Sequence, residues 1–373
     1  MIRKAWIIGH SIVSPLGNTT EENYTYVREG ISGLSRVSDP SLSPDPVFVG
    51  KVTTAVEEEG LSKFESLCKQ VLQQLTATGN FDPAQTLLIL STTKGNIAFL
   101  EEGKLDHPRL HLHATAAYLA EMFGFKSHTV ISNACISGVM ALLVGKRMIE
   151  HGRYANVVVI GADVLSSFVI SGFQSLQALS PEMCKPFDKN RKGINLGECA
   201  AGIVLSANPS DGKENIRIAG GGLSNDANHI SGPSRTGEEL AQAIGQALNE
   251  AKVSADKIDA ISAHGTATLY NDEMEAKAFN LVNLGKVPVN SLKGYYGHTL
   301  GAAGVLETIL SARSLTENEL LPTAGFETPG VSQSLNVTKE LRQQPLTIYL
   351  KTASGFGGCN AAMVLKKETK FES

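Results

Sequence analysis

The fold of this chain is constrained most by residues 129 to 150, which read TVISNACISGVMALLVGKRMIE. The β-branched residues Thr129 to Ile131 predict a short strand, and the apolar run after Cys135 predicts a helix buried on nearly every side. The first backbone N–H groups of a helix have no partner within it, and the helix dipole is positive at that end. We therefore expect the Cys135 thiol to ionise more readily than a free thiol, as a nucleophile requires. The alternative is a structural cysteine, because most buried cysteines act only as small hydrophobic side chains.

Strand-like and helix-like segments alternate on both sides of this stretch, which predicts an α/β fold with parallel strands and helical crossovers. The same order of elements occurs in residues 1–206 and 215–373, so we expect two duplicated halves joined by a linker at 207–214. In the first half we expect strands over 5–15, 86–92, 129–131, 156–163 and 201–206, helices over 20–30, 62–77, 113–123 and after residue 135, and irregular structure over 32–60. In the second half we expect strands over 215–224, 259–265, 287–291, 347–355 and 361–367, with helices over 238–251, 272–284 and 299–315.

Composition argues against several classes of protein. A net charge of −4 argues against nucleic-acid binding, which needs clustered Lys and Arg. The five cysteines show neither a CxxC pair nor a zinc spacing, which favours a reducing compartment, and we expect a cytoplasmic protein. No apolar run reaches the ~18 residues that a membrane span requires, and residues 1 to 17 lack the pattern of a signal peptide.

Three further stretches could supply chemistry. His264 ends an apolar strand in SAHGTATLYNDEMEA, which places it at the sheet edge where α/β proteins keep their sites. His298 opens a helix in NSLKGYYGHTLGAAGVLE, where the helix dipole should keep the imidazole neutral. The corner ASGFGGCNAAM, residues 353–363, can expose backbone N–H groups toward an anion. Each stretch taken singly has an ordinary explanation as a turn or a cap, but few purposes need all of these groups together with a cysteine.

With these residues in place, the chain resembles the β-ketoacyl-[acyl-carrier-protein] synthases, the condensing enzymes of fatty-acid and polyketide synthesis. The resemblance begins at IIGHSIVSPLGN, residues 7–18, and ends near residue 366. NACISG resembles the nucleophile motif of the family, and SGFGGCNAA its last corner. Between them, KPFDKNRKGINLGECA resembles the loop before the fifth strand, AHGTATLYNDEME the first histidine motif and LKGYYGHTLGAAG the second. The Cys-His-His set is similar to that of the elongating synthases.

The resemblance implies a role for each matching residue. Cys135 would hold the acyl chain, and its backbone N–H would form an oxyanion hole with that of Phe356, whose ring matches the family's gate. His264 and His298 would bind the malonyl thioester carbonyl and stabilise the enolate left when CO₂ departs. Further positions match residues that orient the histidines (Lys293, Glu275), contact the phosphopantetheine arm (Thr266, Thr268) or shape the corner (Gly355, Gly357).

The resemblance also implies the fold and the partners. It implies a thiolase-like fold of two duplicated βαβ halves, five layers in the order α-β-α-β-α, with mixed sheets. We expect an acyl carrier protein and malonyl and acyl thioesters as partners, no resident cofactor or metal, and a homodimer. A synthase/chain-length-factor heterodimer and a non-catalytic chain-length subunit are the alternatives. The chain is shorter than a typical member between about residues 30 and 112, which suggests a specialised synthase.

Other interpretations are weaker. Gly9-His10-Ser11 resembles a hydrolase elbow, but Val13 stands where its last glycine belongs. His107, His111 and His113 suggest a metal, but no carboxylate cluster accompanies them. A thiolase-type enzyme acting on coenzyme A would have another set of motifs. Lys63, Lys69 and Arg191 are candidates for a basic patch that receives an acidic carrier protein, although a solvated surface is the better explanation of each.

Overall fold

The strands of the first half form one mixed set in the order β1-β8-β6-β4-β5. The structure is a computed structural model, and it describes residues 3–54, 58–78, 80–212, 214–227 and 232–369. β8 (Cys199–Ser206) pairs antiparallel with both β1 (Ala5–Val13) and β6 (Asn156–Asp163), and β4 (Leu87–Ser91) pairs parallel with both β6 and β5 (Ser127–Ile131). The apolar sequence of β6 fits this place, because all of it after Asn156 is buried.

The second half repeats this arrangement. β16 (Cys359–Thr369) pairs antiparallel with both β9 (Glu214–Asn225) and β15 (Ile348–Ser354), and β10 (Ala260–Ser262) pairs parallel with both β15 and β11 (Pro288–Asn290). Among the five strands named in each half, the first lies at one side, followed by the last, the fourth, the second and the third. The duplication expected from the sequence is therefore present in the topology.

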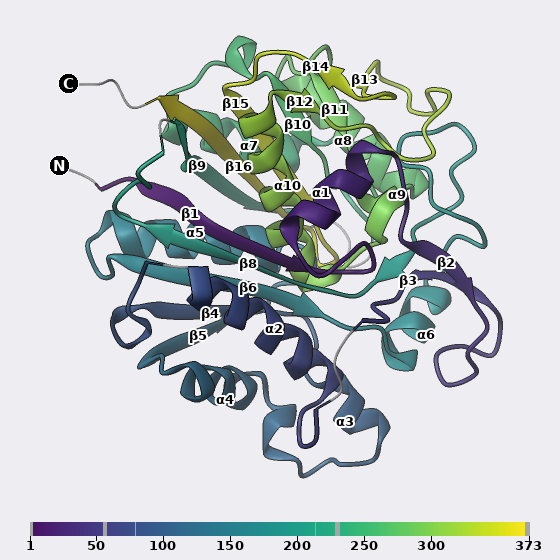
Figure 1. The fold of residues 1–373 in the computed structure, drawn as a ribbon. Coiled ribbons are helices and arrows are strands. Elements are labelled where there is room, and N and C mark those ends of the chain that lie inside the picture. The colour runs from purple at the N-terminus through teal and green to yellow at the C-terminus, as the bar shows by residue number, and fades with distance from the viewer. Residues whose placement is uncertain (1–2, 55–57, 79, 213, 228–231, 370–373) are drawn as a thin grey trace.

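The two sets of strands meet where Ala5–Ile7 of β1 pair with Ile216–Ile218 of β9, which makes one eleven-stranded sheet with β13 (Asn336–Val337) at its far edge. Figure 1 shows the set from β1 to β5 in the lower part of the molecule and the set from β9 to β11 above it. The mixed sheet agrees with the expected fold class. The division into domains at residues 207–214 stays a prediction.

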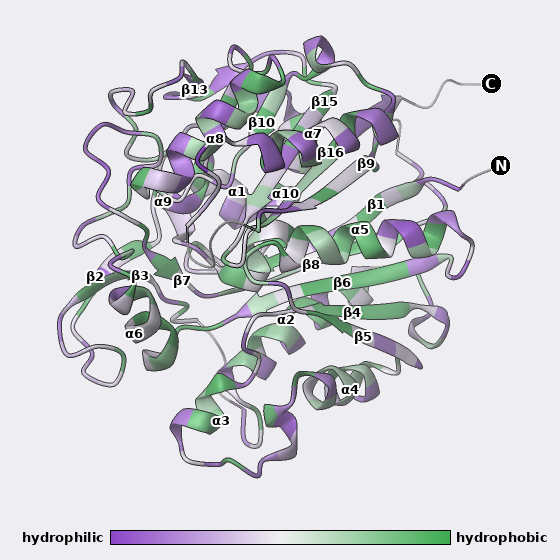
Figure 2. Ribbon diagram, turned by 180° about the vertical axis from the view of Figure 1, so that it is seen from behind, coloured by the Kyte–Doolittle hydropathy of each residue, from purple (hydrophilic) through white to green (hydrophobic). Residues whose placement is uncertain are grey.

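Helices complete the layers. α5 (Ser137–Glu150) and α10 (Ala303–Glu317) contact each other in the middle of the molecule. The outer layers contain α2 (Lys63–Thr78) and α4 (Leu112–Phe123) on the first half, and α7 (Glu238–Ala251) and α8 (Leu269–Leu281) on the second. Figure 2 shows hydrophobic colour along β4 and β6, whereas α7 and α8 carry hydrophilic residues on the outside.

Two glycines let the central helices approach closely. A Cβ added to Gly138 in the first turn of α5 would lie 2.8 Å from the Cα of Gly304, and a Cβ added to Gly304 would lie 2.4 Å from the backbone nitrogen of Val139. Any side chain at these positions would push the helices apart. The starts of α5 and α10 are therefore fixed side by side, and both lead directly from the residues of the site.

Several short elements were not predicted. Residues 32–60 are not all irregular, because β2 (Leu34–Val37) and β3 (Val47–Gly50) form a small sheet with β7 (Leu196–Gly197). The helices α3 (Ile97–Glu101), α6 (Ser167–Ser175) and α9 (Lys293–Tyr296) were also missed. α8 begins at Leu269 rather than at residue 272, because the side chain of Thr268 caps it by accepting a hydrogen bond from the backbone of Asn271.

Candidate active site

The turn that carries Cys135 is held in a strained shape between β5 and α5. Ala134 has a φ of 43°, a left-handed conformation that is rare for residues other than glycine. The hydroxyl of Ser137 stabilises the turn, since it donates to the carbonyl of Ala134 at 2.6 Å and accepts from the backbone of Asn133 at 2.7 Å. This turn places Cys135 two residues before α5, as the sequence predicted.

The expectation that the helix start would make Cys135 unusually acidic is wrong for the protein without substrate. Cys135 is only 7% exposed. Burial raises the pKa of its thiol to about 12, and the neighbouring thiol of Cys359 adds to the rise, while Lys293 and a hydrogen bond from the backbone N–H of Phe356 act in the opposite direction. Removal from water outweighs these stabilising effects, so the thiol is protonated in this state.

His264 is positioned through its backbone. It follows β10, and the backbone N–H groups of His264 and Gly265 donate to the buried carboxylate of Glu275 on α8 at 2.8 and 2.6 Å. Glu275 also accepts from the hydroxyl of Thr352 on β15 at 3.0 Å. Glu275 therefore fixes the chain just after β10 through its backbone N–H groups. It does not form an ion pair with the imidazole of His264.

His298 lies in the tight segment between α9 and α10. Its backbone N–H donates to the carbonyl of Asn195 at 2.7 Å, and its carbonyl accepts from Gly197 at 3.0 Å. A Cβ added to Gly197 would lie 1.9 Å from the carbonyl oxygen of Tyr296, so the loop before β8 can pass the His298 segment only with glycine there. The motif around Gly197 thus helps to position a histidine far away in the sequence.

These three side chains meet. The sulfur of Cys135 and a ring nitrogen from each of His264 and His298 all lie within 4.8 Å of one another. The imidazole rings stand nearly perpendicular, with an interplanar angle of 87° and centroids 5.1 Å apart. Nδ1 of His264 and both ring nitrogens of His298 are buried without a hydrogen-bond partner in the protein. Buried polar atoms seldom stay unpaired, so these nitrogens are available to a bound ligand.

Both imidazoles are neutral. Burial lowers the pKa of His264 and of His298 well below the usual range, and the positive charges of Lys293 and Lys351 lower it further. A neutral imidazole can donate one N–H to an oxygen without giving up a proton. The expectation that His298 would be neutral therefore holds, although burial rather than the helix start is the main cause.

The glycine corner lies beside the cysteine. A Cβ added to Gly355 would lie 3.0 Å from the backbone nitrogen of Cys135 and 2.9 Å from the sulfur of Cys359. The next residue, Phe356, directs its N–H at the Cys135 sulfur, and its 38% exposed side chain packs against Phe173 with ring centroids 5.5 Å apart. Gly357 has a φ of 86° and open space around it, so it serves the turn rather than a close contact.

A cavity of about 580 Å³ opens onto these groups. Its lining includes Cys135, His264, His298, Gly355 and Phe356, together with both threonines of the first histidine motif. The hydroxyls of Thr266 and Thr268 are 2.9 Å apart, within hydrogen-bond distance. The predicted pantetheine-contacting residues thus share one cavity with the predicted reactive residues.

Lys293 pairs with Glu307, a residue that was not predicted from the sequence. Its ammonium contacts the buried carboxylate of Glu307 on α10, which also pairs with Lys351 on β15 at 2.7 Å. Two signals for these residues were present in the sequence. Glu307 interrupts the apolar run GVLETIL, and Lys351 interrupts the apolar strand IYLKTA, and a charge inside such runs needs a buried partner.

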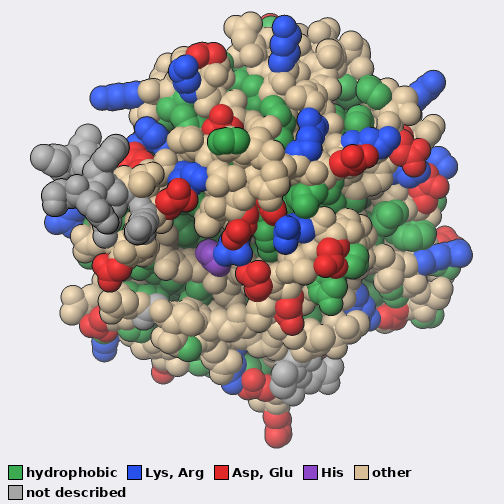
Figure 3. All heavy atoms as spheres, turned by 45° about the horizontal axis from the view of Figure 1, so that its top comes forward, with side chains coloured by type: hydrophobic (Ala, Val, Ile, Leu, Met, Phe, Trp, Pro, Cys, Tyr) green, Lys and Arg blue, Asp and Glu red, His purple; other side chains and the backbone are tan. Residues whose placement is uncertain are grey.

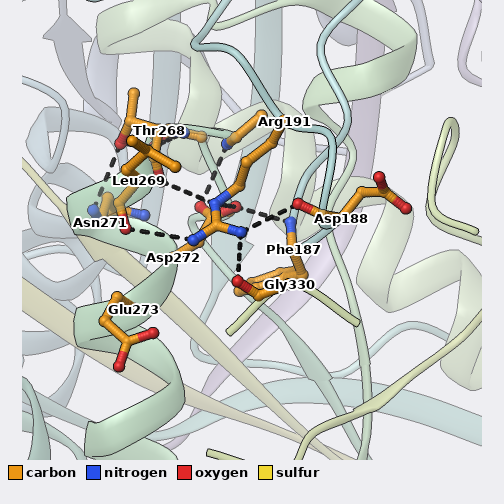
Figure 4. A network of polar contacts seen from close by, with 12 residues as sticks. Phe187, Asp188, Arg191, Thr268, Leu269, Asn271, Asp272, Glu273 and Gly330 are labelled. Carbon is orange, nitrogen blue, oxygen red and sulfur yellow. Dashed lines mark hydrogen bonds and ion pairs between the residues drawn. The ribbon is translucent and has the colours of Figure 1, made fainter. Parts of the chain in front are cut away.

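Arg191 is not part of a free basic patch. Figure 4 shows its guanidinium surrounded by backbone carbonyls and by Asp272, which lies 3.8 Å away. It donates to the carbonyls of Thr268 and Leu269 at 3.4 Å and of Gly330 at 2.6 Å. Asp272 in turn accepts from the backbone of Phe187 at 2.6 Å. This network ties the loop before β8 to the start of α8, and so supports the threonine segment.

The other two candidates for that patch are also engaged. Lys63 contacts the buried Glu198, and Lys69 contacts Glu58. Figure 3 shows basic and acidic side chains interspersed over one face of the molecule. All three cations are therefore engaged within the molecule, Lys69 with a carboxylate only eleven residues away, and their contact with a carrier protein stays a prediction.

The weaker interpretations find no support among the described residues. Cys135, His264 and His298 form the single group there with enough neighbouring ligand atoms for a metal, and this group does not include His111 or His113. The hydrolase-like residues lie within β1, where Ser11 donates to Gln74 at 2.7 Å and His10 is hydrogen-bonded to Thr20 at 3.1 Å. Over the ranges that the structure describes, no helix is long and apolar enough to cross a membrane.

Comparison with known proteins gives the same family from sequence and from structure. Residues 111–209 match the model of the N-terminal domain of β-ketoacyl synthases, and residues 216–327 match that of the C-terminal domain. The 3-oxoacyl-[acyl-carrier-protein] synthase 2 of Coxiella burnetii is 28% identical over 418 aligned positions, covering 98% of this chain and 99% of that protein. The alignment is longer than the chain, so the chain is gapped against this relative.

Two further similar proteins are a polyketide synthase subunit and a ketosynthase of known structure. The ketoacyl synthase alpha subunit of the tetracenomycin polyketide synthase of Streptomyces glaucescens is 36% identical over 261 residues, 65% of this chain and 61% of that one. A ketosynthase from Xenorhabdus doucetiae, solved in complex with its chain length factor, superposes with a TM-score of 0.90 at 26% identity, covering 98% of both chains. The two family models together match more than half of the residues, and the chain belongs to the β-ketoacyl synthase family, the condensing acyltransferases of fatty-acid and polyketide synthesis.

Proposed function

We propose that this protein joins an acyl group held on Cys135 to a malonyl group, with loss of CO₂, and that both groups arrive on an acyl carrier protein. One observation carries the proposal: a thiol and two neutral imidazoles with unpartnered ring nitrogens lie within 4.8 Å at one cavity. A condensation of two thioesters needs one nucleophile for the acyl group and uncharged donors for the enolate oxygen.

The first step is acyl transfer. The sulfur of Cys135 attacks the carbonyl carbon of the acyl thioester, the carbon–sulfur bond to pantetheine breaks, and the thiol proton passes to the departing sulfur. The backbone N–H groups of Cys135 and Phe356 stabilise the negative oxygen that forms on the way. Because the free thiol is protonated, this proton must leave during the attack rather than before it.

The second step is condensation. The bond between the malonyl carboxylate and its α-carbon breaks, CO₂ leaves, and the electron pair forms an enolate whose oxygen accepts N–H bonds from His264 and His298. The enolate carbon then attacks the carbonyl of the acyl-Cys135 thioester. A carbon–carbon bond forms, the bond to sulfur breaks, the cysteine takes up a proton, and the product is a 3-oxoacyl chain two carbons longer.

The partners follow from this chemistry. Thr266 and Thr268 line the cavity where a pantetheine arm would pass, and the threonines offer hydroxyl groups to its amides. We propose that the chain needs no resident cofactor, since thiol, imidazoles and backbone amides suffice for each bond change. All five cysteines are free, which favours a reducing compartment such as the cytoplasm.

A heterodimer with a chain-length subunit is a second candidate for the assembly, beside the homodimer. The ketosynthase from Xenorhabdus doucetiae, to which this chain is similar over 98% of its length, was solved with such a partner. Here Cys135, His264 and His298 are all present, so this chain would be the catalytic member. Mass measurement of the purified native assembly distinguishes the two cases.

Two variants test the proposed function. Cys135→Ala should abolish acyl transfer but leave malonyl decarboxylation, because the histidine pair stays intact. His298→Ala should lose decarboxylation while Cys135 still becomes acylated. Acylation is measured as the mass shift of the intact protein and decarboxylation as CO₂ release. Condensation that persists in Cys135→Ala, or decarboxylation that is unchanged in His298→Ala, would refute the assignment.

A further inference from the structure

Lys351 is a second buried lysine beneath the histidines. It lies on β15 with an exposed fraction of 0%. Its ammonium donates to the carbonyls of Thr352 at 2.6 Å, Ser262 at 3.2 Å and Ala263 at 3.4 Å. Ser262 ends β10 opposite Lys351 in the sheet register, and the chain continues from Ala263 directly into His264. Lys351 therefore holds the backbone that carries His264.

The same ammonium reaches toward the helix that follows His298. It pairs at 2.7 Å with one carboxylate oxygen of Glu307 on α10, and Lys293 pairs with the other. Glu307 is only 3% exposed. The ion pair thus connects the strand end of His264 with the helix that begins just after His298, so one side chain braces both imidazole-bearing segments.

Charge balance gives Lys351 a second effect. Lys351 and Lys293 share the buried carboxylate of Glu307, and the charge of Lys351 also acts on the buried Glu275. Burial raises the pKa of Glu275, and the charge of Lys351 is one of the influences that hold it down. Without Lys351, Glu307 would keep one of its two cations, and the pKa of Glu275 would rise further. Protonated Glu275 would accept the N–H groups of His264 and Gly265 less strongly.

We propose that Lys351 is a positioning residue for the histidine pair, holding the His264 strand end by its hydrogen bonds and bracing α10, the helix after His298, by its ion pair with Glu307. The inference rests on the proposed function, since the pair must act on malonate for its position to matter. Lys351 should therefore affect decarboxylation but not acyl transfer, because acyl transfer depends on Cys135 and the glycine corner, which Lys351 does not contact.

Lys146 provides a matched control. It is 1% exposed, lies toward the far end of α5, and pairs with two carboxylates, Glu150 and Glu250, at 2.8 Å each. Lys146→Met and Lys351→Met therefore remove the same charge from equally buried sites with two nearby carboxylates. A purely structural role predicts similar losses of stability and no selective loss of one half-reaction.

The test compares both half-reactions in the full-length variants with malonyl- and acyl-carrier protein. Lys351→Met should lower malonyl decarboxylation about 10²-fold, as a displaced catalytic group does, and leave the rate of Cys135 acylation unchanged. Lys146→Met should leave both rates unchanged. If Lys351→Met decarboxylates as fast as Lys146→Met, or loses acylation to the same extent as decarboxylation, the proposal is overturned.

Two more variants keep the test decisive if Lys351→Met does not fold. Lys351→Gln keeps N–H donors for the carbonyls but lacks the charge, and should also lose decarboxylation selectively; a parental rate would overturn the proposal. Lys351→Arg keeps the charge and should retain more decarboxylation than Lys351→Gln; equal loss in both would exclude the charge as the cause. A parental protein that releases no CO₂ from malonyl-carrier protein would instead show that the proposed function itself is wrong.

Discussion

Gly355→Ala is the sharpest test of the glycine corner. The added Cβ would lie 2.9 Å from the sulfur of Cys359, 3.0 Å from the backbone nitrogen of Cys135 and 3.2 Å from the Cβ of Ala134. The first distance is shorter than real Cβ contacts, and the second involves backbone that α5 and the Cys135 turn hold in place. The corner itself must therefore shift, and the N–H of Phe356 shifts with it.

The size of the effect follows from that shift. Loss of one oxyanion donor costs about 10²–10³ in rate, equivalent to about 2.7–4 kcal/mol. Overpacking of this kind lowers the free energy of unfolding by about 1–3 kcal/mol. We expect the rate of acyl transfer to Cys135 to fall by about 10²–10³. Decarboxylation by the enzyme without an acyl group should be retained, because the histidines do not contact the amides of the glycine corner in this structure.

Intact-protein mass spectrometry over time measures acylation, and CO₂ release measures decarboxylation. Gly245→Ala is the control: it lies on α7 with nothing within 4 Å of the added Cβ, so it should leave activity unchanged and stabilise the helix by up to about 1 kcal/mol. Acylation by Gly355→Ala at the rate of Gly245→Ala would show that the Phe356 amide does not stabilise the oxyanion.

Three further predictions use other groups. Iodoacetamide should modify Cys135 first, since it is the one cysteine of the five that lines the cavity. With a thiol pKa near 12, the rate of modification should rise about tenfold per pH unit from pH 7 to 9. A plateau by pH 8 would show that the helix start lowers the thiol pKa more than burial raises it. Burial lowers the pKa of His10 to about 4, so the folded state binds fewer protons than the unfolded state between about pH 6.5 and 4. The free energy of unfolding should therefore fall by about 2 kcal/mol as the pH is lowered over that range. A His10→Gln variant with the same acid sensitivity in urea titrations would contradict this. Thr268→Val removes the cap of α8 and should cost about 1 kcal/mol in urea unfolding while raising KM for malonyl-carrier protein; an unchanged KM would remove Thr268 from the binding site.

Local patterns in the sequence were sufficient for much of the fold. β6 and α7 have the predicted bounds, because a continuous apolar run and an amphipathic repeat are signals within one segment. β2 is four residues long and partly exposed, so it carries no such signal and depends on β3 for its hydrogen bonds. The pairing of β1 with β9, which joins the two halves, involves strands about two hundred residues apart and could not be predicted from either.

The residues of the site also differ in how far local sequence patterns could predict them. Cys135, His264 and His298 stand in turns at the ends of elements, where a short sequence motif marks each of them. The Lys293–Glu307–Lys351 cluster depends on contacts between α9, α10 and β15, which no local pattern records. The acidity of Cys135 was misjudged for a related reason: the helix start is local, whereas the loss of water around the thiol is produced by surrounding segments.

The repeated topology has a consequence for how such a site can change. Cys135 precedes the central helix of one repeat and His298 precedes that of the other, and the two helices touch at Gly138 and Gly304. Neither repeat contains all three groups, so the site exists only where the two repeats meet. With both repeats in one chain, the two helix starts can carry different groups, a thiol before α5 and an imidazole before α10.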